Sequence, residues 1–372
     1  MKDANFSSLE TAADFAANVS NSITEKASDK FLTALTRGRR SKWWRRSGNK
    51  NRGFRYLDVS GQIITDENQI KRVNSLAIPP AWREVRICPS ASGSLQALGI
   101  DSAGRLQYKY SQKFAARQQN KKFEKIEQFG QFLPLLRRAT NEHIAHDGLG
   151  KEKVLAIMIR LINDLYIRVG SEKSVKLYKT YGVTTLRNRH LTVQSGGQLH
   201  FNFVGKHHIR HRKVLVDEEL AANIIDLKAI GGSKLFNYLD ANGKACSLKP
   251  QDINNYIKTT TGGNFSAKDF RTWGASLLAA QELAELGPVE TKTQINKNIV
   301  RVVKVVAERL GNTPTVCRNS YVHPSVLEAY QQGITLAEFK PRTKRQIERI
   351  QPEYLPDEVA LLKLLNNQKT LS

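Results

Sequence analysis

Hydrophobic residues follow two different patterns on either side of residue 120. Between residues 56 and 110, short apolar runs are separated by turn residues, a pattern that predicts strands. Beyond residue 120, apolar positions recur every three or four residues, most clearly over 151–166, and this period predicts amphipathic helices. Residues 186–193 and 198–204 flank a Ser-Gly-Gly turn and predict an antiparallel hairpin. Further helices are predicted at 66–75, 123–139, 217–226, 249–259, 266–285 and 291–310. The pattern therefore predicts an α+β chain, with a small β-rich N-terminal domain and a mainly α-helical domain that contains a small antiparallel sheet.

Helix-end signals support three of these boundaries. Ser266–Asp269 has a capping-box pattern at the start of a helix. Gly311 is a C-cap signal for the helix at 291–310. Thr313-Pro314 supplies an N-cap residue and a first-turn proline, which predicts a new helix just before Tyr321.

The net charge of the chain indicates a polyanionic partner. The 372 residues contain 58 Lys and Arg against 34 Asp and Glu, a formal charge of +24, and nucleic acid is the usual polyanion for such an excess. A hydrophobic content of 40% and a charged content of 25% are typical of a globular chain and argue against disorder. The sequence has no apolar run of about 18 residues, so no membrane span is expected, and residues 1–20 do not have the form of a secretory signal. Cys88, Cys246 and Cys317 are too few and too scattered for a disulfide framework or a zinc site, which favours a cytoplasmic protein.

The charge is concentrated near the N-terminus. Residues 1–35 carry five acidic and three basic side chains, whereas Arg37–Tyr56 carries nine basic side chains and no acidic one. We interpret residues 1–50 as an acidic lead segment followed by a flexible basic arm. Trp43 and Trp44 within the arm either stack on bases or pack against the body of the protein, and the sequence does not distinguish the two. The remaining division is predicted to be a β-rich domain at 51–120, a catalytic domain at 121–345 and a C-terminal tail at 346–372.

Motifs for the common cofactors are missing from the sequence. It has no phosphate-binding G-x-x-x-x-G-K-[ST] loop, no G-x-G-x-x-G after a strand and no H-E-x-x-H helix. His207, His208 and His211 form a cluster, but no Cys or carboxylate stands beside them, so we interpret it as a basic loop that faces DNA rather than as a metal site. We therefore expect neither a nucleotide nor a metal cofactor.

Cations next to helix and hairpin ends are the remaining candidates for chemistry. Arg168 follows an apolar helix, Lys206 follows a hairpin strand and Arg271 lies one turn inside the capped helix at 266–285. Each has a structural alternative: Arg168 can be the partner of a helix dipole, and Arg271 can be half of a surface ion pair. Composition and period alone lead to a basic, two-domain protein that binds nucleic acid.

Several segments, in order along the chain, resemble the type IB DNA topoisomerases, in particular the compact poxvirus-like branch found in bacteria. The resemblance covers residues 56–330 and implies a DNA breaking-rejoining fold, with an N-terminal domain that clamps duplex DNA. It is carried by AIPPAW at 77–82, GRLQYKY at 104–110, IRVG at 167–170, FNFVGK at 201–206, KDFRTW at 268–273 and TPTVCRNSY at 313–321.

Matched position by position, the resemblance implies five catalytic residues. Tyr321 corresponds to the nucleophile that forms a 3′-phosphotyrosyl link, and Lys206 to the general acid for the leaving 5′-oxygen. Arg168 and Arg271 correspond to the arginines that hold the phosphate oxygens, a task suited to a rigid and permanently charged guanidinium. Asn312 stands where many members have a histidine, but an amide NH₂ also donates to a phosphate oxygen. Because the link conserves the energy of the broken bond, no ATP is required.

The resemblance also implies DNA contacts, which are Arg105, Gln107, Tyr108 and Tyr110 in one strand and Lys173 in the catalytic domain. Double-stranded DNA is thus the expected partner, and a monomer acting on the bacterial nucleoid is the expected form. A tyrosine recombinase is the alternative from the same chemistry, although recombinases usually carry His-x-x-Arg where this chain has Lys268-x-x-Arg271. A catalytically inactive DNA- or RNA-binding module is the alternative from a different class.

Overall fold

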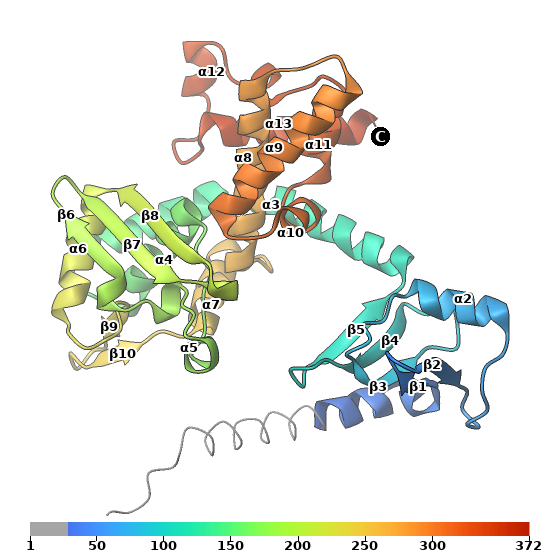
Figure 1. Cartoon of the computed structure of the whole chain (residues 1–372). Helices are drawn as coiled ribbons and strands as arrows, with labels where there is room; N and C mark the ends of the chain where they lie inside the picture. The colour runs from blue at the N-terminus through green and yellow to red at the C-terminus, as the bar shows by residue number, and fades with distance from the viewer. Residues whose placement is uncertain (1–28, 372) are drawn as a thin grey trace, which may run out of the picture. The chain divides into compact units, whose positions relative to one another are not determined.

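A computed structural model describes residues 29–371, which form two compact units that separate after Lys121. The first unit is a five-stranded antiparallel sheet with the order β2-β1-β3-β4-β5 (Figure 1). Its strands are β1 (Trp44–Asn49), β2 (Gly53–Leu57), β3 (Arg83–Ile87), β4 (Leu95–Ile100) and β5 (Leu106–Tyr110). Helix α2 (Glu67–Ser75) begins where the Asp66 side chain accepts a hydrogen bond from the backbone N–H of Gln69. Its Val73 is buried in the same small core as Val85 and Ile87, so the sheet and the helix fold around one apolar centre.

The second half of the basic arm belongs to this sheet, so the prediction of a flexible arm up to residue 50 is wrong for residues 44–49. Trp44 is only 8% exposed and packs in the small core, with the Arg72 guanidinium 5.2 Å from its ring centre. Arg46 is held by backbone carbonyls of residues 78–82, including that of Trp82 at 2.7 Å. Of the two interpretations of the tryptophans, packing against the body therefore describes Trp44. The lead segment up to residue 28 lies outside the described residues.

The second unit is mainly helical and contains two small antiparallel sheets (Figure 1). Its first seven helices are α3 (Gln112–Ala145), which starts in the first unit, α4 (Lys151–Leu165), α5 (Glu172–Tyr178), α6 (Glu218–Ala229), α7 (Pro250–Thr261), α8 (Ala267–Leu286) and α9 (Lys292–Leu310). Then follow α10 (Pro314–Ser320), α11 (Pro324–Gln331), α12 (Lys344–Glu348) and α13 (Pro356–Leu371). The α+β class expected from the sequence is thus confirmed.

The predicted hairpin is present and gains a third strand. The strands β6 (Leu191–Gln194), β7 (Gln198–Val204) and β8 (Arg210–Val216) form one sheet, and β9 (Asn237–Leu239) pairs with β10 (Ala245–Ser247) in another. The first strand begins five residues later than predicted, because residues 188–190 form a 3₁₀ turn.

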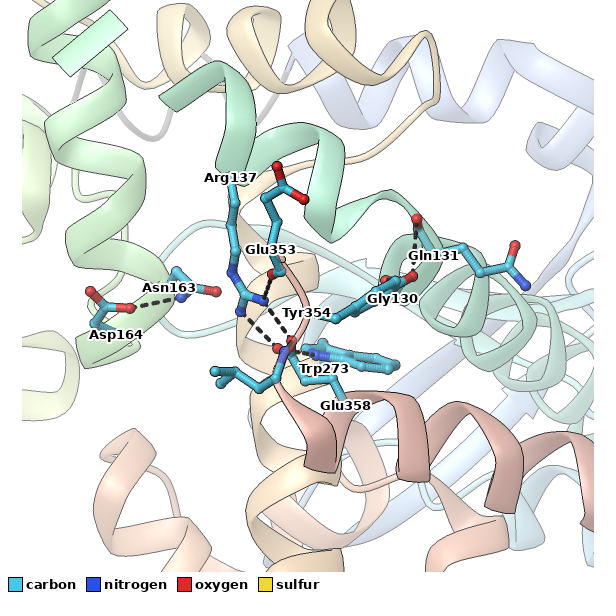
Figure 2. Close-up of polar contacts among 10 residues, drawn as sticks. Gly130, Gln131, Arg137, Asn163, Asp164, Trp273, Glu353, Tyr354 and Glu358 are labelled. Atoms are coloured by element: carbon cyan, nitrogen blue, oxygen red, sulfur yellow. Dashed lines mark hydrogen bonds and ion pairs between the residues drawn. The ribbon is translucent and has the colours of Figure 1, made fainter. Parts of the chain in front are cut away.

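The C-terminal segment after residue 345 is an integral part of the second unit rather than a separate tail. Four apolar residues of α13 are buried in the main core: Ala360, Leu361, Leu364 and Leu365. Ahead of them, Glu358 forms a two-pronged ion pair with Arg137 of α3, at 2.5 and 2.7 Å (Figure 2). The Trp273 indole N–H of α8 donates to the same carboxylate at 3.4 Å, so α13 connects the two long helices.

Candidate active site

Three cations from different elements meet at the C-terminal end of α9, where a helix leaves carbonyl groups without intrahelical partners. Lys213 Nζ donates to the carbonyl of residue 309 at 3.0 Å, Arg271 Nη2 to that of 310 at 2.8 Å, and Arg168 Nη2 to that of 311 at 3.3 Å. These carbonyls also form the negative end of the helix dipole, which attracts cations. We call Lys213, Arg271 and Arg168 the helix-end cluster.

Arg271 is the most deeply buried member of this cluster, at 3% exposed. Its helix α8 starts with the predicted capping box, in which the Ser266 backbone N–H donates to the Asp269 carboxylate at 2.8 Å. Besides residue 310, the guanidinium donates to the Tyr166 carbonyl, and its Nε is buried without a partner among the described residues. Burial, followed by the charge of Arg168, lowers the pKa of Arg271 to about 10. The Arg271 guanidinium therefore remains a cation at neutral pH, and its Nε donor is unused among the described residues.

Arg168 and Asn312 form a second pair of donors in the same place. The Arg168 guanidinium donates to the Asn312 side-chain oxygen as well as to the helix end. Burial lowers the pKa of Arg168, and the nearby Tyr321 side chain opposes that shift. The Asn312 amide nitrogen is buried and has no partner among the described residues. An unpaired buried donor is costly and is satisfied when an acceptor such as a phosphate oxygen enters.

Tyr321 follows directly on α10, which begins as predicted with Thr313 as its N-cap residue. Its carbonyl accepts a hydrogen bond from Ser276 Oγ of α8 at 3.3 Å, and the preceding carbonyl accepts one from Lys122 Nζ of α3 at 3.0 Å. The Arg271 guanidinium lies 5.4 Å from the tyrosine ring centre, and both active-site arginines are within hydrogen-bonding reach of its side chain. The site therefore places a phenol hydroxyl next to two fixed cations.

Lys206 is the one predicted catalytic residue that the structure does not bring into this group. It is exposed in the turn between β7 and β8, and within residues 29–371 its amine makes no hydrogen bond or ion pair. The two residues after it, His207 and His208, have left-handed backbone angles, with φ of 63° and 59°. The turn is thus sharply bent and presents Lys206 to solvent.

The predicted DNA contacts of the first unit lie along or beside the edge strand β5. Tyr108 and Tyr110 are 41% and 47% exposed, with ring centres 6.2 Å apart. Arg105 and Gln107 both bind the Asp101 carboxylate, at 2.8 and 2.9 Å. In the second unit, Lys173 is exposed in the first turn of α5.

Sequence reasoning missed two residues of the site, His211 and Lys213. Along β8, Arg210 and Arg212 are exposed whereas His211 and Lys213 are partly buried, so the interpretation of the histidine cluster as a loop facing DNA is wrong for His211. The His211 ring stacks on Phe203, with ring centres 5.1 Å apart. Burial and neighbouring cations lower the pKa of His211 to about 4 and that of Lys213 to about 8. The signal in the sequence was the alternation of inward and outward residues that is typical of a strand. It was hard to recognise because basic residues occupy both faces of the strand.

The lowered pKa of His211 predicts a pH dependence of stability. In the unfolded chain His211 is protonated below its ordinary pKa of 6.5, whereas in the folded chain it is protonated only below about pH 4. The free energy of unfolding therefore falls as the pH drops from 6.5 to about 4. His211→Gln is expected to recover about 2 kcal/mol of that loss at pH 4.5, taking one pKa unit as 1.36 kcal/mol and allowing for partial exposure. Melting curves of both proteins at pH 7.5 and 4.5 measure the effect, and an equal loss in both proteins would contradict it.

Within residues 29–371, no group of three or more His, Cys, Asp or Glu side chains is arranged to hold a metal ion. Nor does that part of the chain contain a helix with the length and apolar character required to cross a bilayer.

A tyrosine hydroxyl beside two fixed guanidinium groups suits phosphoryl transfer with a tyrosine nucleophile, since that reaction depends on positioning and on charge stabilisation. The fold and the site are thus those of an enzyme that breaks and rejoins phosphodiester bonds through a tyrosine. The chain also matches two families in sequence: "Eukaryotic DNA topoisomerase I, catalytic core" over residues 111–350, and "Bacterial DNA topoisomerase IB, N-terminal domain" over 53–101.

Curated relatives agree with this result. DNA topoisomerase 1B of Acanthamoeba polyphaga mimivirus is 33% identical over 288 residues, which cover 75% of this chain and 84% of the relative. DNA topoisomerase 1B of Vaccinia virus strain Copenhagen is 25% identical over 289 residues, covering 72% of this chain and 87% of the relative. DNA topoisomerase 1 of Mycosarcoma maydis is 27% identical over 231 residues, or 55% of this chain and 22% of the relative.

The chain therefore belongs to the type IB DNA topoisomerase family, the class of ATP-independent enzymes that relax DNA through a tyrosine. The family resemblance, the fold class and the reaction class expected from the sequence are confirmed, and the N-terminal match supports the bacterial branch. Neither a recombinase nor an inactive binding module is supported.

Proposed function

We propose that this protein relaxes supercoiled double-stranded DNA by cleaving one strand at a time with Tyr321. The Tyr321 hydroxyl oxygen attacks the scissile phosphorus and loses its proton. The bond from phosphorus to the 5′-oxygen breaks, and that oxygen takes up a proton and leaves as a 5′-hydroxyl. After strand rotation, the hydroxyl attacks the 3′-phosphotyrosyl link, which restores the DNA and the free tyrosine without ATP.

The unused donors of the site carry this proposal. The backbone at the end of α9 fixes one edge of Arg168 and of Arg271, while Arg271 Nε and the Asn312 amide nitrogen are buried and have no partner within residues 29–371. Donors fixed before the substrate arrives stabilise the charge that develops on the phosphate oxygens without the cost of rearrangement. Asn312 thus takes the place of the histidine that is frequent in the family.

Lys206 is proposed as the general acid that protonates the leaving 5′-oxygen. Its position in an exposed turn requires bound DNA to bring the phosphate to the lysine, since its amine has no partner in the part of the chain that the structure describes. A lysine ammonium carries a proton that it can donate to the leaving oxygen, which suits this role.

The role of Lys206 can be tested with a leaving group that needs no proton. We expect Lys206→Ala to slow single-turnover cleavage by about 10²–10⁴-fold on ordinary DNA, and a 5′-bridging phosphorothiolate to restore most of the rate. Lys173→Ala is the matched control, and it should weaken binding without being rescued. An equal defect of Lys206→Ala on both substrates would reduce Lys206 to a phosphate contact.

The other assignments of the family follow as part of the same proposal. Residues 51–120 would supply the DNA-clamping domain, with Arg105, Gln107, Tyr108 and Tyr110 as contacts, and residues from 121 onward the catalytic domain, with Lys173 as a phosphate contact. A monomer acting on the bacterial nucleoid without a cofactor or a metal is the expected form. Relaxation of a supercoiled plasmid with EDTA present and ATP absent tests the function as a whole, and a plasmid that stays supercoiled would contradict it.

A further inference from the structure

A pocket of about 370 Å³ lies where the chain after α5 meets β7 and β8. It is lined by Lys179, Tyr181, Arg189, His190, Asn202, Phe203, Val204 and Arg210. Figure 1 shows α5 next to the end of the β7–β8 hairpin, and the Tyr181 backbone N–H donates to the Val204 carbonyl at 2.8 Å. Pockets that hold small ligands measure about 300–1,000 Å³, so this one has room for a phosphate with part of its sugar. None of its residues takes part in the chemistry described above.

The charge of this β7 pocket is positive and uncompensated. Lys179, Arg189 and Arg210 line it without any carboxylate, and among the described residues none of the three forms an ion pair. Within residues 29–371, the Arg189 guanidinium forms one long hydrogen bond, to the Tyr181 hydroxyl at 3.4 Å. Burial together with the charges of two arginines lowers the pKa of His190 to about 4, so this histidine adds no charge at neutral pH. Three free cations around one hollow fit an oxyanion, which accepts charge-assisted hydrogen bonds from guanidinium groups.

The same residues border the turn that carries Lys206. Val204, the last residue of β7, pairs with Arg210, the first residue of β8. The turn between them is closed by a hydrogen bond from the Gly205 N–H to the Ile209 carbonyl at 2.8 Å. On the far side, His208 Nε2 lies 3.1 Å from the Tyr178 carbonyl at the end of α5. A ligand in the pocket is thus adjacent to the turn that the proposed mechanism needs near the cleavage site.

We propose that the β7 pocket binds one phosphate of the DNA backbone other than the scissile phosphate, through Arg189, Arg210 and Lys179. The proposal rests on the proposed function for the identity of the ligand. The bound phosphate fixes the DNA strand beside the base of the β7–β8 turn, which brings the scissile phosphate within reach of Lys206.

A binding cycle between the protein and single phosphates tests this site. In a Tyr321→Phe background, affinity is measured for duplexes that each carry one neutral methylphosphonate at a different position near the cleavage site. The pocket variant is Arg189→Gln with Arg210→Gln, and the matched control is Lys297→Gln with Arg301→Gln, two exposed cations of α9. All four substitutions are on exposed side chains, and melting curves verify that each variant is folded.

On unmodified DNA the pocket variant should bind roughly tenfold more weakly, the order of one charge-assisted contact. At one position the methylphosphonate should weaken the Tyr321→Phe parent and the control variant to a similar extent and leave the pocket variant unchanged. The proposal would be overturned if, at every position, the loss of affinity from the methylphosphonate were the same in the pocket variant as in the parent. It would also be overturned if the pocket variant bound unmodified DNA as tightly as the control variant does. Coupling to an abasic site instead of a methylphosphonate would overturn it in favour of base binding.

This experiment can fail separately from the proposed function. Because binding is measured without cleavage, the coupling can appear even if Tyr321 is not the nucleophile. Conversely, a wild-type protein that forms a covalent adduct but shows no coupling would overturn the pocket alone.

Discussion

Tyr321→Phe is expected to abolish both plasmid relaxation and the covalent protein–DNA adduct while leaving DNA affinity within about twofold of the wild type. The substitution removes one oxygen atom. The ring keeps its place because the backbone is held on both sides: Ser276 donates a hydrogen bond to the Tyr321 carbonyl, and Lys122 donates one to the carbonyl of the preceding residue. Without the hydroxyl no atom of this side chain can attack phosphorus. Denaturing gels with end-labelled DNA detect the adduct, and a filter-binding titration measures the affinity.

The matched control for this experiment is Tyr178→Phe, an exposed tyrosine at the end of α5 that should keep full cleavage activity. An adduct formed by Tyr321→Phe would assign the nucleophile to another residue. Loss of DNA binding together with cleavage would point instead to a structural role for the hydroxyl.

Glu358→Gln is expected to destabilise the second unit by about 3–5 kcal/mol, the range for removing one partner of a buried ion pair. Glu358 is 2% exposed and accepts hydrogen bonds from both terminal nitrogens of Arg137 and from the Trp273 indole N–H (Figure 2). It also accepts one from the backbone N–H of Leu355. The neutral amide removes the carboxylate that is hydrogen-bonded to the largely buried arginine charge. Urea unfolding followed by tryptophan fluorescence measures the loss.

Glu353→Gln provides the comparison, because its partner Arg138 has a side chain that is 56% exposed. A more exposed pair contributes about 0–1 kcal/mol, so this variant should be nearly as stable as the wild type. Equal losses for the two variants would show that the C-terminal segment is held by its apolar residues and not by the ion pair.

The fold could be predicted from the sequence wherever one face of an element is apolar. Helices α8 and α9 begin and end within one residue of the predicted bounds, since periodicity and caps are local signals. Strand β1 was missed because its inward residues are Trp44 and Arg46, which do not form an apolar pattern. The Arg46 guanidinium is hydrogen-bonded to backbone carbonyls that lie 32 to 36 residues further along the chain. Only the folded chain shows such a partner.

The candidate site was predicted from the resemblance, residue by residue, and not from physical chemistry alone. Arg168, Arg271, Asn312 and Tyr321 do come together, but the two arginines are held there by backbone carbonyl groups, which every residue possesses and which leave no trace in the sequence. Lys213 was missed for the same reason. The exposed position of Lys206 could not be predicted either. The resemblance implies a role for Lys206 when DNA is bound, and it does not describe where the side chain lies in the protein alone.

The residue that ends α9 has no functional group at all, yet it determines where the reactive groups lie. Gly311 adopts φ of 61°, and a Cβ atom there would stand 2.6 Å from the His211 ring. A methyl group there would have to displace the His211 ring or shift the helix end, whose carbonyls hold two arginines. A substitution at Gly311 is therefore strained both in its backbone and in its contact with His211, at a position that a search for chemically active side chains would pass over.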